Sequence, residues 1–358
     1  MSTTDPNAPE IILITGINGY IASHIGLILL SRGYTVRGTS RSSSAEKQLR
    51  SGAYKDYQSQ YQHALVPDIT APAAFDEAVK GVHGIIHTAS PVDFTLTSLD
   101  AFFGPAIGGN LSLLNSTLQA GEQLKAFVVT SSIAAIIDGW KNPPDYTYTE
   151  ADWNTSGEAV ARSDFTAPVA YGASKAAAER ALWDWREQHH PKFSVSVVNP
   201  AVVTGPPVNW PETPEKLNET LLPVWQIFSG EAKELPGQIG PAIYVDVRDV
   251  ASLHVWCLEH PEEADGGRYL AANGKGNPQA MADMLRREYP DKEIVVGTPG
   301  SGYVQGSYWY PEGELSLVSK KAYTALGVER FMGFEQSILD TVRAFEERWP
   351  ERLRNSKR

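Results

Sequence analysis

Cysteine, long apolar runs and positive charge are all scarce in this 358-residue sequence. The single cysteine, Cys257, excludes an internal disulfide, and its apolar neighbours predict a buried thiol in a reducing compartment. No apolar run reaches the length that spans a bilayer, and the first residues, MSTTDPNAPE, lack the basic start and apolar core of a signal peptide. We therefore expect a cytosolic protein with no membrane partner.

The charge balance is acidic, with 42 Asp and Glu against 31 Lys and Arg, a net charge of -11 and a pI near 5.3. A polyanion such as nucleic acid is therefore a poor partner, because binding a phosphate backbone needs clustered positive charge. The basic end, residues 351–358, has no interleaved aromatic residues and predicts a solvated tail. Neither a metal-ligand spacing nor a GxSxG nucleophile motif is present, so we expect no metal site.

Short apolar runs alternate with amphipathic stretches over the first 200 residues, and the runs are ILIT, YTVRGTS, HALVPDI, GIIHTAS, AFVVTSS and SVSVVNP. Strands that alternate with helices predict an α/β fold with a Rossmann-type, doubly wound parallel sheet, because parallel strands need crossover connections. Ligands of such sheets bind beyond the carboxyl ends of the strands. The residues that follow each apolar run are therefore the candidates for chemistry.

The alternation stops near residue 204, where several prolines interrupt a segment that contains tryptophans. We predict a dinucleotide-binding domain over residues 9–203, to which residues 242–261 return as a strand and a helix. A smaller, discontinuous C-terminal substrate-binding lobe is expected from residues 204–241 and 262–350.

The stretch TGINGYIASHIG contains Gly16, Gly19 and Ala22 at intervals of three, directly after the first apolar run. Gly16 permits a tight turn, Gly19 lets the backbone approach a phosphate closely, and Ala22 lets a helix pack closely on the strand. A strand, a turn and a helix without any ligand would show the same pattern, but its place after the first strand favours a pyrophosphate site.

The second apolar run ends with Arg37 and Arg41, and no acidic residue is present there to accept a bond from an adenine ribose hydroxyl. Cations at this position suit a 2′-phosphate, which favours NADP(H) over NAD(H), although both arginines could also be solvated surface residues. Asp68, after the third run, could accept from an adenine amino group or cap a helix.

Tyr171 and Lys175 are four residues apart in a helical pattern, so both side chains share one face. A cation there can lower the pKa of the phenol, which makes the pair suitable for acid-base catalysis. Ser132 follows the fifth apolar run, and a hydroxyl at the carboxyl end of a strand can donate to a substrate oxygen. Its neighbours Thr130 and Ser131 are alternatives, because hydroxyls also cap turns.

Taken together, these motifs resemble those of the extended short-chain dehydrogenase/reductase family, and the resemblance covers nearly the whole length of the chain. TGINGYIASHI resembles the glycine motif, IIHTAS the strand end that lines the cofactor, TSS with YGASK the catalytic set, and NPAVVTGP the segment beside nicotinamide. Within the family, GYTVRGTSR, HTASPV, PAIGG and VDVRDVA resemble the branch of dihydroflavonol reductases, cinnamoyl-CoA reductases and yeast or fungal NADPH-dependent aldehyde and ketone reductases. The stretch PVAYGASK is most similar to the fungal carbonyl reductases.

The resemblance implies hydride transfer from NADPH to a carbonyl carbon, with Tyr171 as proton donor. It further implies that Ser132 hydrogen-bonds the same oxygen and that Lys175 holds the nicotinamide ribose. The expected cofactor-binding residues are Gly16, Asn18, Gly19, Tyr20, Ile21, Arg37, Arg41, Asp68, Ile69, Thr88, Ala89, Ser90, Thr130, Tyr171, Lys175, Pro200 and Val203. The expected substrate contacts, for each of which core packing is an alternative, are Val92, Phe94, Ile133, Phe165, Val203, Trp210 and Trp225.

Two other functions stay open. An NAD-dependent nucleotide-sugar epimerase or dehydratase shares the sheet and the Tyr/Lys pair, but the two arginines after the second run count against it. A regulator that senses NADP(H) without catalysis would not need Ser132, Tyr171 and Lys175 together. The Trp- and Pro-rich lobe indicates a partly apolar small-molecule substrate, whereas the stereochemical outcome and the choice between monomer and homodimer stay open.

Overall fold

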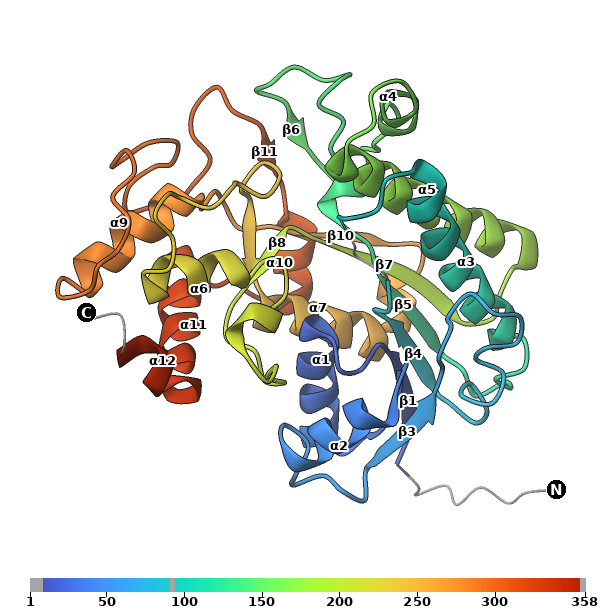
Figure 1. The fold of residues 1–358 in the computed structure, drawn as a ribbon. Coiled ribbons are helices and arrows are strands. Elements are labelled where there is room, and N and C mark those ends of the chain that lie inside the picture. Colours follow the sequence, from blue (N-terminus) through green and yellow to red (C-terminus); the bar gives the residue numbers. More distant parts are fainter. Residues whose placement is uncertain (1–8, 91–93, 355–358) are drawn as a thin grey trace. The chain divides into compact units, whose positions relative to one another are not determined.

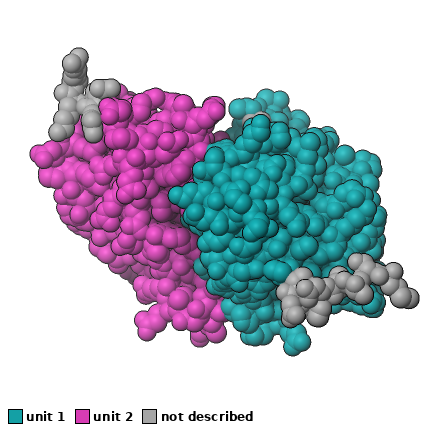
Figure 2. All heavy atoms as spheres, turned by 90° about the horizontal axis from the view of Figure 1, so that it is seen from below, with its two compact units in different colours: residues 1–138, 153–199, 251–269 teal, residues 139–152, 200–250, 270–358 magenta. Residues whose placement is uncertain are grey.

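The computed structural model describes residues 9–90 and 94–354, which form two compact units (Figure 2). The first unit is built from the described residues within 1–138, 153–199 and 251–269, and the second from those within 139–152, 200–250 and 270–358. Among the described residues, no helix combines the length and the apolar character needed to cross a bilayer.

A seven-stranded sheet in the order β10-β7-β5-β4-β1-β2-β3 forms the centre of the first unit (Figure 1). Its strands are β1 (Ile11–Thr15), β2 (Thr35–Ser40), β3 (Tyr61–Leu65), β4 (Gly84–His87), β5 (Ala126–Thr130), β7 (Ser194–Pro200) and β10 (Arg268–Ala271). The pairs from β3 across to β7 are parallel, with β1 between β4 and β2. The predicted α/β fold with a Rossmann-type parallel sheet is therefore confirmed.

Helices lie on both faces of the sheet. The helices that belong mainly to the first unit are α1 (Tyr20–Ser31), α2 (Ser43–Ser51), α3 (Leu99–Thr117), α4 (Gly157–Ser163), α5 (Ala167–His189), α7 (Val247–Glu259) and α8 (Pro261–Ala264), with a short 3-10 turn, η1 (Ile133–Ala135). Figure 1 shows α3 and α5 side by side, on the opposite side of the sheet from α1. Alternate strand residues face opposite sides of a sheet, and Leu13, Phe127 and Val197 pack with Leu113 of α3 and Leu182 of α5 in one buried cluster.

The second unit is built from short elements. They are β6 (Thr147–Tyr148), β8 (Val202–Thr204), η2 (Pro214–Lys216), α6 (Leu222–Ser229), β9 (Tyr244–Asp246), α9 (Pro278–Glu288), β11 (Ser316–Leu317), α10 (Lys320–Leu326), α11 (Phe334–Arg348) and α12 (Pro350–Arg354). Its core is aromatic: the Trp225 ring is fully buried and lies 5.5 Å from the Phe345 ring and 5.4 Å from the Trp349 ring, centroid to centroid.

The units differ from the predicted domain boundaries at several places, and one of them is the segment 139–152, which was predicted in the first domain and belongs to the second unit. β9 pairs with β8 in a separate two-stranded sheet, so the segment that returns to the first unit is residues 251–269 and not 242–261. β10, which was expected in the substrate lobe, joins the large sheet beside β7. The predicted basic tail begins inside α12, where Arg352 forms an ion pair with Glu215, and its last residues, 355–358, lie outside the described residues.

Candidate active site

The turn between β1 and α1 is shaped by two glycines. Gly16 has a φ of +65°, and a Cβ atom there would lie 3.2 Å from the Cα atom of Ala89. A Cβ at Gly19 would lie 3.0 Å from the carbonyl oxygen of Gly16. Gly19 is also the N-cap of α1 and offers no side chain to accept from the first helical N–H groups. The first N–H groups of a helix and the positive end of its dipole together suit an anion such as a pyrophosphate.

The ends of β1 and β4 are joined by the Thr15 hydroxyl. It accepts from the backbone N–H groups of Thr88 and Ala89, both at 3.1 Å, and its oxygen lies 2.7 Å from Nδ1 of His87. The Thr88 hydroxyl in turn donates to the Thr15 carbonyl oxygen at 2.5 Å. These bonds place Ala89 against Gly16, so the two chain segments predicted to line the cofactor do lie together.

Three consecutive hydroxyls end the fifth strand, and the structure distinguishes them. Thr130 Oγ1 lies 2.7 Å from Nε2 of His254, and the Ser131 hydroxyl donates to the buried carboxylate of Glu179 at 2.5 Å. Neither is directed at the Tyr171 phenol. The Thr130 hydroxyl is thus bonded to His254, and its predicted contact with the cofactor stays a prediction.

Ser132 is the hydroxyl that meets the predicted acid-base pair. Burial raises the pKa of the Tyr171 phenol above its usual value, and the Ser132 hydroxyl beside it acts more weakly in the opposite direction. The Ser132 oxygen accepts from the backbone N–H of Ala134 at 3.1 Å, which holds its side chain in place. The phenol therefore stays protonated at neutral pH, with a second hydroxyl beside it.

Lys175 is buried one helical turn after Tyr171, with its side chain 8% exposed. Its Nζ lies 5.8 Å from the centroid of the Tyr171 ring and donates to the Ser90 hydroxyl at 3.0 Å. Burial lowers the pKa of Lys175 to about 8, against the opposing effect of the Glu179 carboxylate. We expected this cation to lower the pKa of the Tyr171 phenol. The pKa is instead raised, because burial of the phenol is the largest effect on it.

His87 stays neutral beside this cation. Burial, and then the charge of Lys175, lower the pKa of His87 to about 4. The site therefore gathers one buried cation, one neutral phenol, one neutral imidazole and the Ser132 hydroxyl at the carboxyl edge of the sheet.

Arg37 does not belong to this edge, and its assignment to a 2′-phosphate was wrong. It lies in the middle of β2, and its guanidinium donates to Gln62 Oε1 at 3.0 Å and to the carbonyl oxygens of Ala78 and Lys80 at 2.8 and 2.7 Å. Residues 78–80 precede β4, so this side chain faces the amino ends of the strands. Arg41, directly after β2, is exposed at the carboxyl end, where a 2′-phosphate is expected.

Asp68 and Ile69 follow β3, which ends at Leu65, earlier than predicted, shortly before Pro67. Asp68 Oδ1 accepts from the backbone N–H and the hydroxyl of Thr70 at 2.8 and 2.7 Å, and these bonds lower the pKa of Asp68. Asp68 thus closes a local turn and caps no helix. Ile69 packs over Gly109 of α3, which leaves any cofactor contact of its side chain a prediction.

The remaining cofactor candidates lie at the loop and strand ends where they were expected. Asn18 precedes α1, and Tyr20 and Ile21 open its first turn. Pro200 ends β7 and Val203 lies in β8, where its carbonyl oxygen accepts from Thr220 at 2.6 Å. These contacts stay predictions.

The predicted substrate contacts differ in their surroundings, and the ring of Phe94 lies beside that of Tyr171. The Phe94 ring lies 5.5 Å from the Tyr171 ring, whereas the Phe165 ring lies 6.4 Å from the Phe102 ring; Phe94 and Phe165 are both exposed. Ile133 is buried at the start of η1. Val92 lies outside the described residues.

Of the two tryptophans proposed as substrate contacts, Trp225 belongs to the aromatic core of the second unit, and the partly buried Trp210 packs against that core. Trp225 is a core residue and was wrongly assigned, because its ring is fully buried against Phe345 and Trp349. Trp210 packs edge-on against Trp349, at 5.2 Å between centroids. Aromatic residues in a loop-rich segment could serve either purpose, and sequence pattern alone could not separate them.

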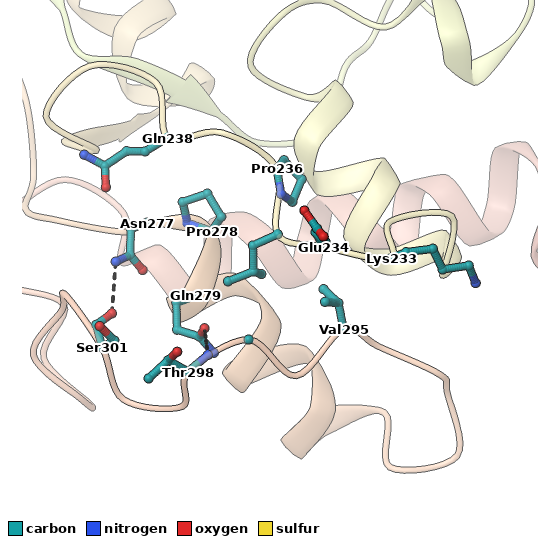
Figure 3. Close-up of a pocket in the computed structure, with 12 residues that line it drawn as sticks. Lys233, Glu234, Pro236, Gln238, Asn277, Pro278, Gln279, Val295, Thr298 and Ser301 are labelled. Carbon is teal, nitrogen blue, oxygen red and sulfur yellow. Dashed lines mark hydrogen bonds between the residues drawn. The ribbon is translucent and has the colours of Figure 1, made fainter.

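A pocket of about 430 Å³ in the second unit contains none of the predicted catalytic residues (Figure 3). Its amide side chains are committed to the surrounding backbone: Asn277 Nδ2 donates to the Ser301 carbonyl oxygen at 3.0 Å, and Gln279 Oε1 accepts from the Thr298 N–H at 2.7 Å. Asn277 also caps α9. These groups hold the loop onto the helix, and the pocket carries no acid-base pair.

Sequence reasoning missed a buried polar cluster directly behind Ser132 and Lys175. Glu179, Asn199 and Arg268 form it, and their exposed fractions are 1%, 0% and 8%. The available signal was the position of Glu179, four residues after Lys175 on the same helix face.

Residues 12–272 match the NAD dependent epimerase/dehydratase family. The chain is 32% identical over 345 residues to the NADPH-dependent methylglyoxal reductase of Saccharomyces cerevisiae, covering 92% of this chain and 96% of that protein. It is 30% identical over 338 residues to aldehyde reductase 2 of Sporidiobolus salmonicolor, covering 93% and 95%. The crystal structure of yeast methylglyoxal/isovaleraldehyde reductase complexed with NADPH matches with a TM-score of 0.82 at 29% identity, covering 96% of this chain and 99% of that chain.

These matches confirm the resemblance to the extended short-chain dehydrogenase/reductases and to their branch of yeast and fungal carbonyl reductases. The family match spans the glycine turn, the predicted catalytic residues and β10 in one continuous range. The chain therefore belongs to the NAD dependent epimerase/dehydratase family.

Proposed function

We propose that this protein is an NADPH-dependent carbonyl reductase, which converts an aldehyde or a ketone to an alcohol. The observation that carries the proposal is the convergence of the Ser132 hydroxyl, the Tyr171 phenol and the Lys175 ammonium group at one edge of the sheet. The names of the two relatives, a methylglyoxal reductase and an aldehyde reductase, support the same reaction class.

Tyr171 acts as the proton donor. Its raised pKa keeps the phenol protonated at neutral pH, so a proton is available for the oxygen of a carbonyl that gains a hydride at carbon. The Ser132 hydroxyl, held by the Ala134 N–H, is placed to hydrogen-bond the same oxygen. Addition of one hydride and one proton converts the C=O group to CH–OH.

Lys175 supplies a buried positive charge beside the donor and, with Ser90, offers polar groups to a ribose. The turn at Gly16 and Gly19 would hold a pyrophosphate at the first N–H groups of α1, and Arg41 would hold a 2′-phosphate. NADPH, when bound, supplies the hydride. The fit rests on the close approach of backbone at both glycines and on the uncapped helix end.

Phe94 gives the site an apolar wall beside Tyr171, which favours a carbonyl compound with an apolar substituent. Ile133, Phe165, Val203 and Trp210 stay predicted substrate contacts. A cytosolic location and action on a small molecule complete the proposal, and the choice between monomer and homodimer stays open.

The main alternative is an NAD-dependent epimerase or dehydratase, which the family description includes. An exposed arginine directly after β2, in place of an acidic residue, favours NADPH and thus the reductase. A regulator that only senses NADP(H) would not require a protonated phenol beside a serine hydroxyl.

The test is the loss of NADPH absorbance by the purified protein with methylglyoxal, aromatic and aliphatic aldehydes, ketones and β-keto esters, with NADH in parallel. Turnover with NADPH on any carbonyl supports the proposal and ranks the substrates. Tight binding of NADPH with no turnover on the whole panel contradicts it and favours the regulator.

A further inference from the structure

A buried ion pair lies directly behind the proposed catalytic trio. Glu179 of α5 and Arg268 of β10 have 1% and 8% of their side chains exposed, and Arg268 Nε lies 2.5 Å from Glu179 Oε1. The Arg268 guanidinium also stacks on the Trp153 ring, 3.8 Å from its centroid. Burying a charge costs free energy unless the charge is paired and hydrogen-bonded. We therefore asked what this buried ion pair contributes to the neighbouring site.

The second oxygen of the same carboxylate is bonded to the segment that carries Ser132. Glu179 Oε2 accepts from the Ser131 hydroxyl at 2.5 Å and from Asn199 Nδ2 at 2.8 Å. Asn199 Nδ2 also donates to the carbonyl oxygen of Ser132 at 3.2 Å. Two acceptors therefore fix the orientation of the Asn199 amide, and through it the carboxylate is linked to the backbone of Ser132.

Glu179 also belongs to the helix that carries the other two catalytic groups. Tyr171, Lys175 and Glu179 follow one another at intervals of four residues on α5, so their side chains share one face. The groups that face Lys175 are His87 from β4, the Ser90 hydroxyl, and Tyr171 and Glu179 from its own helix. Glu179 is the only anion in this set of described residues.

We propose that Glu179, held by Arg268 and linked through Asn199 to Ser132, is a positioning residue that fixes the catalytic serine against the helix bearing Tyr171 and Lys175. The inference rests on the proposed function. Arg268 neutralises one side of the carboxylate, while the other side holds Ser131 and Asn199. The same anion supports the positive charge of Lys175, so the cluster has one geometric effect and one electrostatic effect.

Two variants separate these effects. Asn199→Leu cuts the link to Ser132 and leaves Glu179, Arg268 and Lys175 charged. It is a tolerable change in volume, and among the described residues Asn199 Oδ1 has no hydrogen-bond partner to lose. We expect kcat to fall between roughly tenfold and a hundredfold, because small displacements of reacting groups are costly, with the KM for NADPH and the pH profile retained.

The double variant Glu179→Gln/Arg268→Met removes the anion together with its partner, so that no buried charge is left alone. The amide that replaces the carboxylate can still accept from Ser131 and Asn199 through its oxygen. Without the anion, Lys175 loses its proton at lower pH. The basic limb of kcat/KM for NADPH, which reports the free enzyme, is expected to move down by about one pH unit.

The control is Arg186→Gln. Arg186 also lies on α5, but it pairs with Asp265, which is not part of the Glu179 cluster. The control variant should leave kcat and the pH profile unchanged. Unchanged kcat in folded Asn199→Leu, or an unmoved basic limb in the folded double variant, would overturn the inference while wild-type turnover keeps the proposed function intact. If wild-type protein turns over no carbonyl at all, the proposed function and this inference fall together.

Discussion

The Ser132 hydroxyl lies beside the Tyr171 phenol, although the two residues are 39 positions apart in the sequence. Two parallel strands and a crossover helix bring them together, because Ser132 follows β5 and Tyr171 lies near the start of α5, which packs on that sheet. The neighbouring hydroxyls of Thr130 and Ser131 are held by His254 and Glu179. Of these three adjacent hydroxyls, Ser132 is therefore the one proposed to meet the substrate.

This arrangement predicts the effect of Ser132→Ala. Loss of one donor to the carbonyl oxygen should lower kcat by about a hundredfold and leave NADPH binding within about twofold, since such donors act mainly in the transition state. Steady-state kinetics with fluorescence titration of NADPH measures both quantities. Ser163→Ala, an exposed serine at the end of α4, is the control. Full activity of Ser132→Ala would show that the wrong hydroxyl has been assigned.

The two arginines of the second strand should behave differently. Arg41→Ala should weaken NADPH by roughly tenfold or more and barely affect NADH, because a charge-assisted bond to the 2′-phosphate is lost. Arg37→Ala should leave the ratio of the two affinities unchanged and lower the free energy of unfolding, because two carbonyl groups lose their donor. Dissociation constants for both cofactors decide the matter. Equal losses for NADPH and NADH in Arg41→Ala would remove the argument for NADPH.

The glycine turn gives a matched pair of variants. Gly16→Ala places a methyl group 3.2 Å from Ala89 at a φ of +65°, and should abolish NADPH binding besides costing about 1–2 kcal/mol of stability. Gly33→Ala has the same type of strain at a φ of +90° but nothing within 4 Å, so it should lose a similar stability and keep binding. Thermal unfolding with and without NADPH tests the pair. Equal ligand-induced stabilisation of both variants would argue against the turn as the phosphate site.

The buried charge of Lys175 should lower the free energy of unfolding, although the residue is needed for the proposed activity. Burial lowers the pKa of its ammonium group from 10.5 to about 8, so between these pH values the unfolded chain binds more protons and stability rises with pH. Lys175→Met should therefore stabilise the cofactor-free protein at pH 7, by at most about 3 kcal/mol, and abolish turnover. The gain should shrink as the pH rises above 8. A gain that is constant from pH 7 to 9.5 in urea unfolding would show that the lysine titrates normally.

Much of the fold and the acid-base pair could be predicted because they depend on local spacing. The alternation of strands and helices predicts the parallel sheet, and an interval of four on a helix places Tyr171 beside Lys175 whatever the surroundings. Arg37 was misplaced because the pattern did not show where β2 ends: the strand continues for three more residues, to Ser40. The error moved one cation from the amino side of the sheet to the carboxyl side.

Other features depend on burial, which local spacing does not reveal. Glu179 was overlooked because a glutamate on a helix is usually solvated, and only the tertiary fold brings Arg268 to it from a distant strand. Trp225 was misassigned for the opposite reason: an aromatic residue in a proline-rich segment can line a site or fill a core, and here it fills the core of the second unit.

The most direct test of the account compares wild-type protein with Tyr171→Phe, using Tyr146→Phe, a partly exposed tyrosine bonded to Asp152, as the control. NADPH consumption and alcohol formation are measured together on the best carbonyl of the panel. The account predicts one alcohol formed for each NADPH consumed by the wild type and by Tyr146→Phe, and a loss of roughly a hundredfold to ten-thousandfold in kcat for Tyr171→Phe with NADPH binding retained. Near-normal turnover by Tyr171→Phe, or wild-type protein that retains NAD and consumes no cofactor, would contradict it.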